Sequence, residues 1–421
     1  MEIKIKRKPY DKVKKIKKPK HKRPKKPSRF FNWLIRAISK KELKKVGFVY
    51  SYTNVPEKGP YLILMNHSSF IDLKIAATIF KGKPYNIVST TDGLIGKKWL
   101  MRKLGCIPTQ KFVHDPTLIS DIKYCLKKKR SVLMFPEAGY SLDGTVTPIP
   151  NGLSRLIKIL NVPVIFVKSS GAFSYDPLYN ELQTRNVIVS AEVRQIISRK
   201  DILNKSNEEL DSILKYYFTF DNFKWQQDHK IIIDEPFRAD GLDRVLYKCP
   251  HCLKEGQTKG EGIYLTCKNC NTTYMLDAFG FLRAIKDETK FNHVPTWFKW
   301  QREEVKKEIL NGTYLLDEEV DIGMIVDYKA LYMVGKGRLK HDVNGFTLTS
   351  YDGKLNYRQS PLSSHTINVD FYWYEIGDVI SIGDRNALYY CFTKKGVPVA
   401  KARLAAEEIY KIKKAETMSE N

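Results

Sequence analysis

Short apolar runs alternate with helical spacing over the first half of the chain. Runs of about four to eight apolar residues predict buried strands, whereas apolar residues three and four positions apart predict amphipathic helices. The predicted strands cover 61–65, 85–89, 132–135, 164–167 and 187–193. The predicted helices cover 71–80, 97–104, 116–128, 153–160 and 206–218. This alternation predicts an α/β domain over residues 46–240.

The pattern changes toward the end of the chain. Turn signals such as Asn344-Gly345 and Asp352-Gly353 separate short β-prone runs from about residue 314. Helical spacing covers 295–310, inside a helical linker that we place over 281–312, and returns at 402–413. We expect a small antiparallel β-rich domain over 313–413, loosely pleckstrin-like and closed by a C-terminal helix. Residues 414–421 are expected to form a disordered tail.

A histidine and an aspartate follow the first predicted strand. His67 lies on the turn after 61–65, and Asp72 lies in the first turn of the next helix, close enough to reach back. A neutral histidine held by a carboxylate can remove a proton from a hydroxyl. The alternative is that Ser69 and Asp72 form an ordinary capping box and that His67 is a loop residue.

A second polar turn follows the strand at 132–135. Glu137 comes directly after it, on a turn of small residues. Ligands of open α/β sheets bind outside the carboxyl ends of the strands, so Glu137 and His67 are expected to border one cleft. The alternative for Glu137 is a solvated turn carboxylate.

These stretches together resemble the glycerolipid acyltransferase family, which includes the lysophosphatidic acid acyltransferases. The family pattern is Asn-His, four residues and Asp, followed later by Phe-Pro-Glu-Gly-Thr-Arg-Ser. Residues 66–72 match the first block completely, and 135–141 match the second at Phe135, Pro136, Glu137 and Ser141. The stretches 105–111 and 162–167 fit the two remaining blocks. The resemblance covers roughly residues 46–235.

Four positions depart from the family pattern, and the two that replace arginines bear on phosphate binding. Tyr140 stands where the family has an arginine, Ala138 and Gly139 replace its glycine and threonine, and Lys111 replaces a second arginine. Arginine binds phosphate bidentately, whereas lysine is a point charge and tyrosine a single neutral donor. The head group of the acceptor is therefore left open.

The resemblance implies transfer of an acyl group from a thioester, on acyl-carrier protein or coenzyme A, to the hydroxyl of a lysophospholipid. The implied acceptor is 1-acyl-glycerol-3-phosphate and the product phosphatidic acid. His67 would be the general base, steadied by Asp72, and no catalytic cofactor is implied. The implied substrate-binding residues are Glu137, Ser141, Lys111, Gly139 and Tyr140.

The charge of the chain is concentrated at its start. The formal net charge is +26 over 421 residues, and residues 1–28 alternate lysine runs with prolines, which predicts a disordered polybasic arm. Residues 29–45 predict an amphipathic helix, too short in apolar length to span a bilayer. Together with the polybasic N-terminal arm, this helix suits an anionic membrane surface. The alternative is that the helix packs on the catalytic domain, and the two are compatible. Without an apolar stretch typical of a secretory signal, we expect a cytoplasmic protein, peripheral on the inner face of the membrane.

Four cysteines form two Cys-x-x-Cys knuckles. Cys249 and Cys252 are separated by 14 residues from Cys267 and Cys270. This spacing predicts a closed zinc ribbon over 241–280 that holds one structural Zn²⁺. Two disulfides are the alternative, which fits poorly with a chain expected in the cytosol.

Two other function classes compete with an enzyme. A lysine-rich arm, a zinc ribbon and a β-rich domain also suit a nucleic-acid-binding protein, but that hypothesis leaves the four acyltransferase blocks unexplained. A catalytically altered lipid-binding scaffold is suggested by Tyr140, although the intact His67 and Asp72 argue against it.

Overall fold

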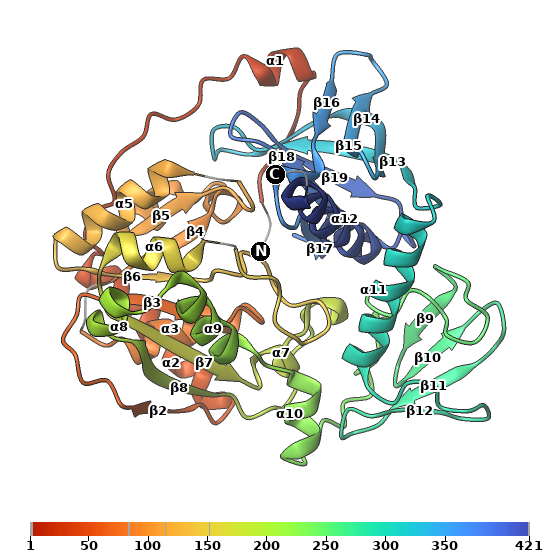
Figure 1. Cartoon of the computed structure of the whole chain (residues 1–421), viewed down its shortest axis with the longest axis horizontal. Coiled ribbons are helices and arrows are strands. Elements are labelled where there is room, and N and C mark those ends of the chain that lie inside the picture. Colours follow the sequence, from red (N-terminus) through yellow and green to blue (C-terminus); the bar gives the residue numbers. More distant parts are fainter. Residues whose placement is uncertain (1–2, 83–84, 114, 151, 420–421) are drawn as a thin grey trace.

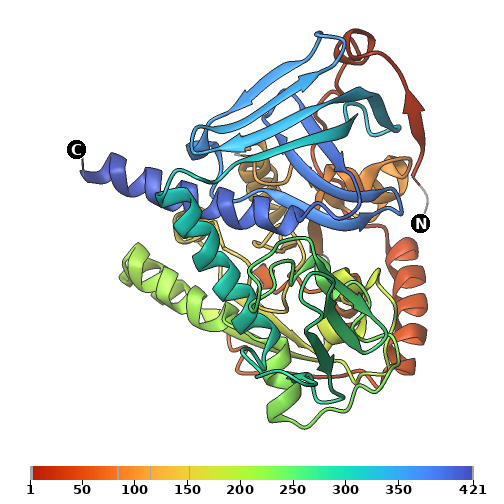
Figure 2. The same ribbon diagram turned by 90° about the vertical axis from the view of Figure 1, so that its right-hand side faces the viewer.

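Three β-sheets organise the chain in the computed structural model, which describes residues 3–82, 85–113, 115–150 and 152–419 (Figures 1 and 2). The first sheet belongs to the predicted α/β domain, the second to the cysteine-containing segment, and the third to the β-rich domain near the C-terminus. These parts follow one another along the chain in that order.

The first sheet has seven strands in the order β2-β8-β7-β3-β6-β4-β5. All neighbours are parallel except β7 and β8. The strands are β2 (Val49–Thr53), β3 (Leu62–Met65), β4 (Tyr85–Thr90), β5 (Cys106–Thr109), β6 (Ser131–Met134), β7 (Val164–Ser170) and β8 (Ser190–Ile197). Sequence patterns missed β2 and β5, because β2 is exposed along most of its length and β5 contains a proline.

Helices cover both faces of this sheet (Figure 1). On β3, Leu62 and Leu64 pack with α5, α6 and α9, whereas Ile63 and Met65 pack with α2 and α3. The helices of this domain are α2 (Arg29–Lys45), α3 (Ile71–Ile79), α4 (Lys98–Lys103), α5 (Pro116–Lys127), α6 (Leu153–Leu160), α7 (Ala172–Tyr175), α8 (Arg199–Asn204), α9 (Asn207–Phe218) and α10 (Asn222–Asp228). The α/β layering is therefore present as predicted.

The two polar turns meet because β3 and β6 are neighbours. These strands run parallel, with Leu64 opposite Met134. The turn that carries His67 and the turn that carries Glu137 consequently leave the sheet side by side, at its carboxyl edge.

The second sheet holds the cysteines and is antiparallel, in the order β12-β11-β10-β9. Its strands are β9 (Thr258–Glu261), β10 (Tyr264–Cys267), β11 (Thr273–Leu276) and β12 (Leu282–Ala284). The predicted boundary at residue 280 is thus too early, since β12 completes the sheet. Helix α11 (Val294–Leu310) packs beside it, and Trp297 donates a hydrogen bond to the carbonyl of Lys248 at 2.9 Å.

The third sheet is an antiparallel path, β16-β15-β14-β13-β19-β18-β17. Its strands are β13 (Leu316–Met324), β14 (Leu331–Asp342), β15 (Gly345–Ser350), β16 (Asn356–Gln359), β17 (Asn368–Trp373), β18 (Gly377–Gly383) and β19 (Leu388–Thr393). Helix α12 (Val399–Ser419) packs on β17 and β18. The likeness to a pleckstrin fold stays a prediction. Residues 414–419 continue α12, so the predicted disorder is wrong there; residues 420–421 lie outside the described range.

The N-terminal arm is ordered over its described part, contrary to the prediction. Strand β1 (Ile5–Arg7) pairs in parallel with β14, and α1 (Tyr10–Lys14) buries Tyr10 and Val13 in the core of the β-rich domain. The arm then crosses to α5, where Arg23 pairs with Asp121 at 3.0 Å (Figure 1). A few buried anchors hold a segment whose lysine content alone indicates disorder.

None of the helices in the described ranges combines the length and the apolar character that crossing a bilayer requires. Helix α2 spans the residues predicted for the amphipathic helix, buries Ser39 and Leu43, and packs on α3.

Candidate active site

His67 and Asp72 are in contact. Nδ1 of His67 lies 3.2 Å from Oδ2 of Asp72, and the Asp72 side chain is fully buried. Because a carboxylate only accepts hydrogen bonds, this contact places the imidazole proton on Nδ1. Nε2 then carries the free lone pair, and none of the described residues offers it a hydrogen bond.

Asp72 also holds the turn that precedes α3. Its Oδ2 accepts the backbone N–H groups of Ser68 at 2.7 Å and Ser69 at 3.0 Å, and its Oδ1 accepts the hydroxyl of Ser169 at 3.1 Å. The Ser69 hydroxyl does not complete a capping box with Asp72, because it donates to Asp176 instead. The alternative of a Ser69–Asp72 capping box is therefore wrong, and the one carboxylate fixes both the turn and the imidazole.

Two aromatic rings hold the imidazole of His67. The Phe135 ring stacks on it, with centroids 4.1 Å apart, and the Tyr140 ring tilts against it at 4.3 Å. The His67 side chain remains 15% exposed. Tyr140, which replaces a family arginine, thus serves as a wall of the histidine site.

Glu137 does not point at open space. Its Oε1 accepts the backbone N–H of His67 at 3.0 Å, and its Oε2 accepts the N–H and the hydroxyl of Thr147 at 3.1 and 3.0 Å. Burial raises the pKa of Glu137 to about 7, a rise that these donors limit. The side chain joins two loops, which differs from both expectations, an acceptor contact and a solvated turn carboxylate.

Ser141 and Gly139 belong to the same turn. The Ser141 hydroxyl donates to the carbonyl of Thr145 at 2.6 Å and accepts the N–H of Gly144 at 2.9 Å. The Ser141 N–H donates to the carbonyl of His67 at 3.3 Å. Gly139 lies beside Asn368 of β17. Ser141 therefore shapes the loop, and its hydroxyl is already engaged.

Lys111 lies in a charged cluster with the β-rich domain. Its Nζ is 3.2 Å from Oδ2 of Asp92, and its side chain is 12% exposed. Burial raises the pKa of Asp370, on β17, to about 7, while the charge of Lys111 opposes that rise. An acceptor phosphate at Lys111 would have to compete with Asp92.

Several residues of the site escaped prediction. Asp176 accepts the hydroxyl of Ser69, and burial raises its pKa to about 7. Ser169 and Thr147 complete the bonds of Asp72 and Glu137. Ser169 lies on β7, next to β3, so assigning β7 as a parallel neighbour of β3 would have placed Ser169 near the site. Asp176 and Thr147 lie in loops, and no sequence pattern marks them.

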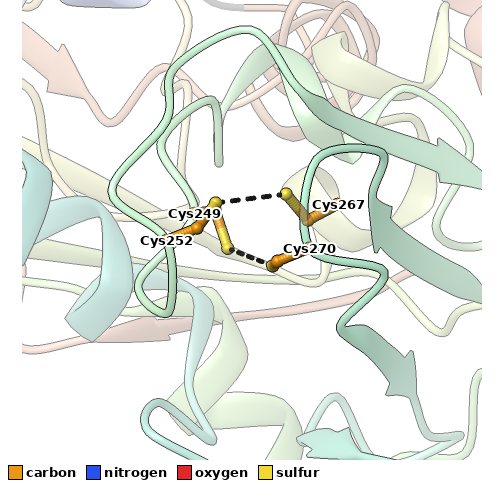
Figure 3. A group of neighbouring side chains, drawn as sticks. All are labelled: Cys249, Cys252, Cys267 and Cys270. Atoms are coloured by element: carbon orange, nitrogen blue, oxygen red, sulfur yellow. Dashed lines mark hydrogen bonds between the residues drawn. The ribbon is translucent and has the colours of Figure 1, made fainter.

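The four cysteines converge at the edge of the second sheet. The Sγ atoms of Cys249 and Cys270 are 3.7 Å apart, those of Cys252 and Cys267 are 3.6 Å apart, and all four lie within 4.8 Å of one another (Figure 3). Sulfurs around a tetrahedral zinc with bonds of ~2.3 Å are separated by ~3.8 Å. Disulfide sulfurs would be ~2.05 Å apart. The cluster therefore has the spacing of metal ligands.

Comparison with known proteins identifies the first domain. Residues 48–169 match the family model described as Acyltransferase. A chloroplastic 1-acyl-sn-glycerol-3-phosphate acyltransferase of Brassica napus is 28% identical over 155 residues, which are 35% of this chain and 42% of that protein. The chain thus spans less than half of the length of this curated relative. The 1-acyl-sn-glycerophosphate acyltransferase PlsC of Thermotoga maritima aligns over 44% of this chain and 76% of its own, with 17% identity and a TM-score of 0.35.

Replacing Glu137 by glutamine should destabilise the fold. At pH 8 the ionised carboxylate accepts three donors, whereas a glutamine amide would point its own N–H₂ at one of them. We expect the free energy of unfolding, measured by urea denaturation, to fall by about 1–3 kcal/mol. Glu303→Gln, at an exposed position of α11, is the matched control. Equal stability of both variants would contradict the assigned role of Glu137.

Proposed function

We propose that this chain, whose residues 48–169 form a domain of the glycerolipid acyltransferase family, transfers a fatty acyl group from a thioester to the hydroxyl of a lysophospholipid. The donor would be acyl-carrier protein or coenzyme A. The acceptor would be 1-acyl-glycerol-3-phosphate, giving phosphatidic acid. The observation that carries the proposal is the contact of His67 with the buried Asp72 at the meeting point of both motif turns.

His67 would act as the general base. Nε2 takes the proton of the acceptor hydroxyl while the oxygen attacks the thioester carbonyl carbon. Asp72, at Nδ1, stabilises the imidazolium that forms. When the carbon–sulfur bond breaks, the imidazolium returns the proton to the leaving thiolate. The acyl group passes directly to the acceptor, so an enzyme nucleophile is not needed.

Glu137 would act as a positioning residue. It holds the backbone of His67 to the Thr147 loop, and both of its buried carboxylate oxygens already accept hydrogen bonds. Acceptor contacts then fall to Tyr140, the amides of its turn, and Lys111 if the phosphate displaces Asp92. This arrangement supports an acceptor with a hydroxyl close to an anionic group.

The exposed side of α2 supports binding to a membrane surface. Phe30, Trp33 and Ile38 are more than half exposed, and Trp33 and Trp99 of α4 are each 64% exposed. Aromatic side chains beside basic ones are typical of helices that lie in the interface of an anionic bilayer. We therefore place the protein peripherally on such a membrane, where its lipid acceptor resides.

The cysteine cluster would hold one Zn²⁺. Four thiolates at metal-ligand spacing close the coordination sphere, so the ion would be structural. It would join the knuckle at 249–252 to the end of β10 in a sheet whose strands have only three or four residues each. No catalytic step requires it.

Removal of the His67 side chain tests the catalytic role. With labelled acyl-coenzyme A and acyl-carrier protein as donors and a panel of lysophospholipids, we expect His67→Ala to lower the transfer rate by about 10²–10⁴-fold. His229→Ala, a surface histidine, should retain activity. Equal background transfer by the wild-type and His67→Ala proteins across the panel would overturn the proposal.

Elemental analysis tests the metal site. Purified protein should contain one zinc per chain, and the Cys267→Ala/Cys270→Ala variant should lose it and melt several degrees lower. Cys125→Ala, outside the cluster, should keep the metal. Wild-type protein without stoichiometric zinc would contradict the assignment.

Vesicle co-sedimentation tests the membrane face. Because Trp33 and Trp99 are exposed, Trp33→Ser/Trp99→Ser should fold normally yet bind vesicles of phosphatidylcholine and phosphatidylglycerol at least tenfold more weakly. Tyr216→Ser removes an equally exposed aromatic ring from α9 and should bind like wild type. Unchanged binding of the double variant would exclude this face.

A further inference from the structure

A basic cavity lies apart from the His67 site. It has a volume of about 1000 Å³, is open to solvent, and is lined by residues 22–26 of the arm, Arg102 of α4, and Tyr124 and 128–130 at the end of α5. Eight of its ten lining residues are lysine or arginine. Arg130 immediately precedes β6, whereas the Glu137 turn, which lies beside the His67 turn, follows the other end of that strand. The cavity and His67 are therefore at opposite edges of the sheet.

The arm is fixed against this cavity by its backbone. The guanidinium of Arg102 donates to the carbonyls of Lys22 and Arg23, each at 3.4 Å, and Asn86 donates to the carbonyl of Lys25 at 2.9 Å. The Tyr124 ring centroid lies 5.6 Å from the guanidinium of Arg23 and 5.5 Å from that of Arg130, within the range of cation–π contacts. These bonds hold the main chain, and among the described residues none pairs with the ammonium groups of Lys22, Lys25 and Lys26 in the cavity.

The positive charge of the cavity is largely uncompensated. None of its lining residues is acidic, and the nearby Asp121 already pairs with Arg23 and His21 at 3.0 and 2.9 Å. Arg130 is only 5% exposed, and its buried Nη1 has no hydrogen-bond partner among the described residues. The helix dipole of α5 favours the cations at 128–130, which follow its C-terminus. It does not explain the additional positive charges that residues 22–26 of the arm bring to the cavity.

We propose that this cavity binds a multiply charged phosphate group, with Arg130 as the buried anchor. Because Nη1 is buried, the Arg130 guanidinium would have to turn toward the cavity that it lines, where a phosphate oxygen would supply the missing acceptor. Several negative charges on the ligand would offset the crowded lysines. The phosphate would come from a soluble ligand or from lipid headgroups. The second source is close at hand, because α4 carries both Arg102 in the cavity and the exposed Trp99.

Calorimetric titration of the full-length chain with inorganic pyrophosphate at low salt tests the soluble source. Sedimentation with phosphatidylcholine vesicles, with and without phosphatidic acid, tests the lipid source. In whichever of these two experiments shows binding, Arg130→Gln and Lys25→Gln/Lys128→Gln should each raise the dissociation constant about tenfold or more. Lys15→Gln/Lys17→Gln removes the same charge from the arm outside the cavity and should change it less than twofold.

The double variant keeps the test decisive if Arg130→Gln fails to fold, because Lys25 and Lys128 are exposed. The site is supported if the cavity variants weaken binding in one of the two experiments and the control variant does not. The experiment that shows this effect identifies the source of the phosphate. Absence of binding in both experiments, or equal weakening by both double variants, overturns the proposal. His67→Ala should bind like wild type, which separates this site from the catalytic proposal.

Discussion

The buried carboxylate of Asp72 is the constraint on which the site depends. Burying a charge costs several kcal/mol of folding free energy unless hydrogen bonds compensate it. The buried Asp72 carboxylate therefore depends on the four donors around it. Two come from the turn after β3, one from the His67 ring, and one from Ser169 on β7. Asn66 adds to this lock, since its Oδ1 accepts the N–H of Ser169 at 2.8 Å and its Nδ2 donates to that residue's carbonyl at 3.1 Å. The requirement to satisfy one charge thus fixes the strand ends and the imidazole together.

Local spacing made the core of the site predictable from the sequence. Asp72 reaches His67 across one turn, and the apolar runs before both motif turns predict the strands whose carboxyl ends meet. The role of Glu137 was not predictable in the same way. Its partners are a backbone N–H on another loop and Thr147, ten residues on, and neither contact leaves a pattern in the sequence. The sequence therefore predicts that Glu137 lies near His67, whereas the hydrogen bonds of Glu137 become visible only in the structure.

The N-terminal arm shows where composition misleads. Its lysines and prolines indicate disorder, yet Tyr10 and Val13 enter a core that also contains Trp297 and strands of the β-rich domain. Such long-range burial cannot be seen in a local window. The same core includes Leu142 and Phe173 of the first domain, so the cysteine-containing sheet and the β-rich domain pack with the catalytic turn region as one body. The arm is held first on the β-rich domain, through β1 and α1, and then on α5, where it brings the basic residues 22–26.

The proposed role of His67 requires that Asp72 hold the ring proton on Nδ1 and leave Nε2 free. Nitrogen-15 NMR of the His67 ring, assigned by comparison with His67→Ala and recorded where the imidazole is neutral, measures this tautomer directly. We expect a protonated Nδ1 and an unprotonated Nε2, with loss of that preference in Asp72→Asn. A ring protonated on Nε2 in the wild-type protein would contradict it.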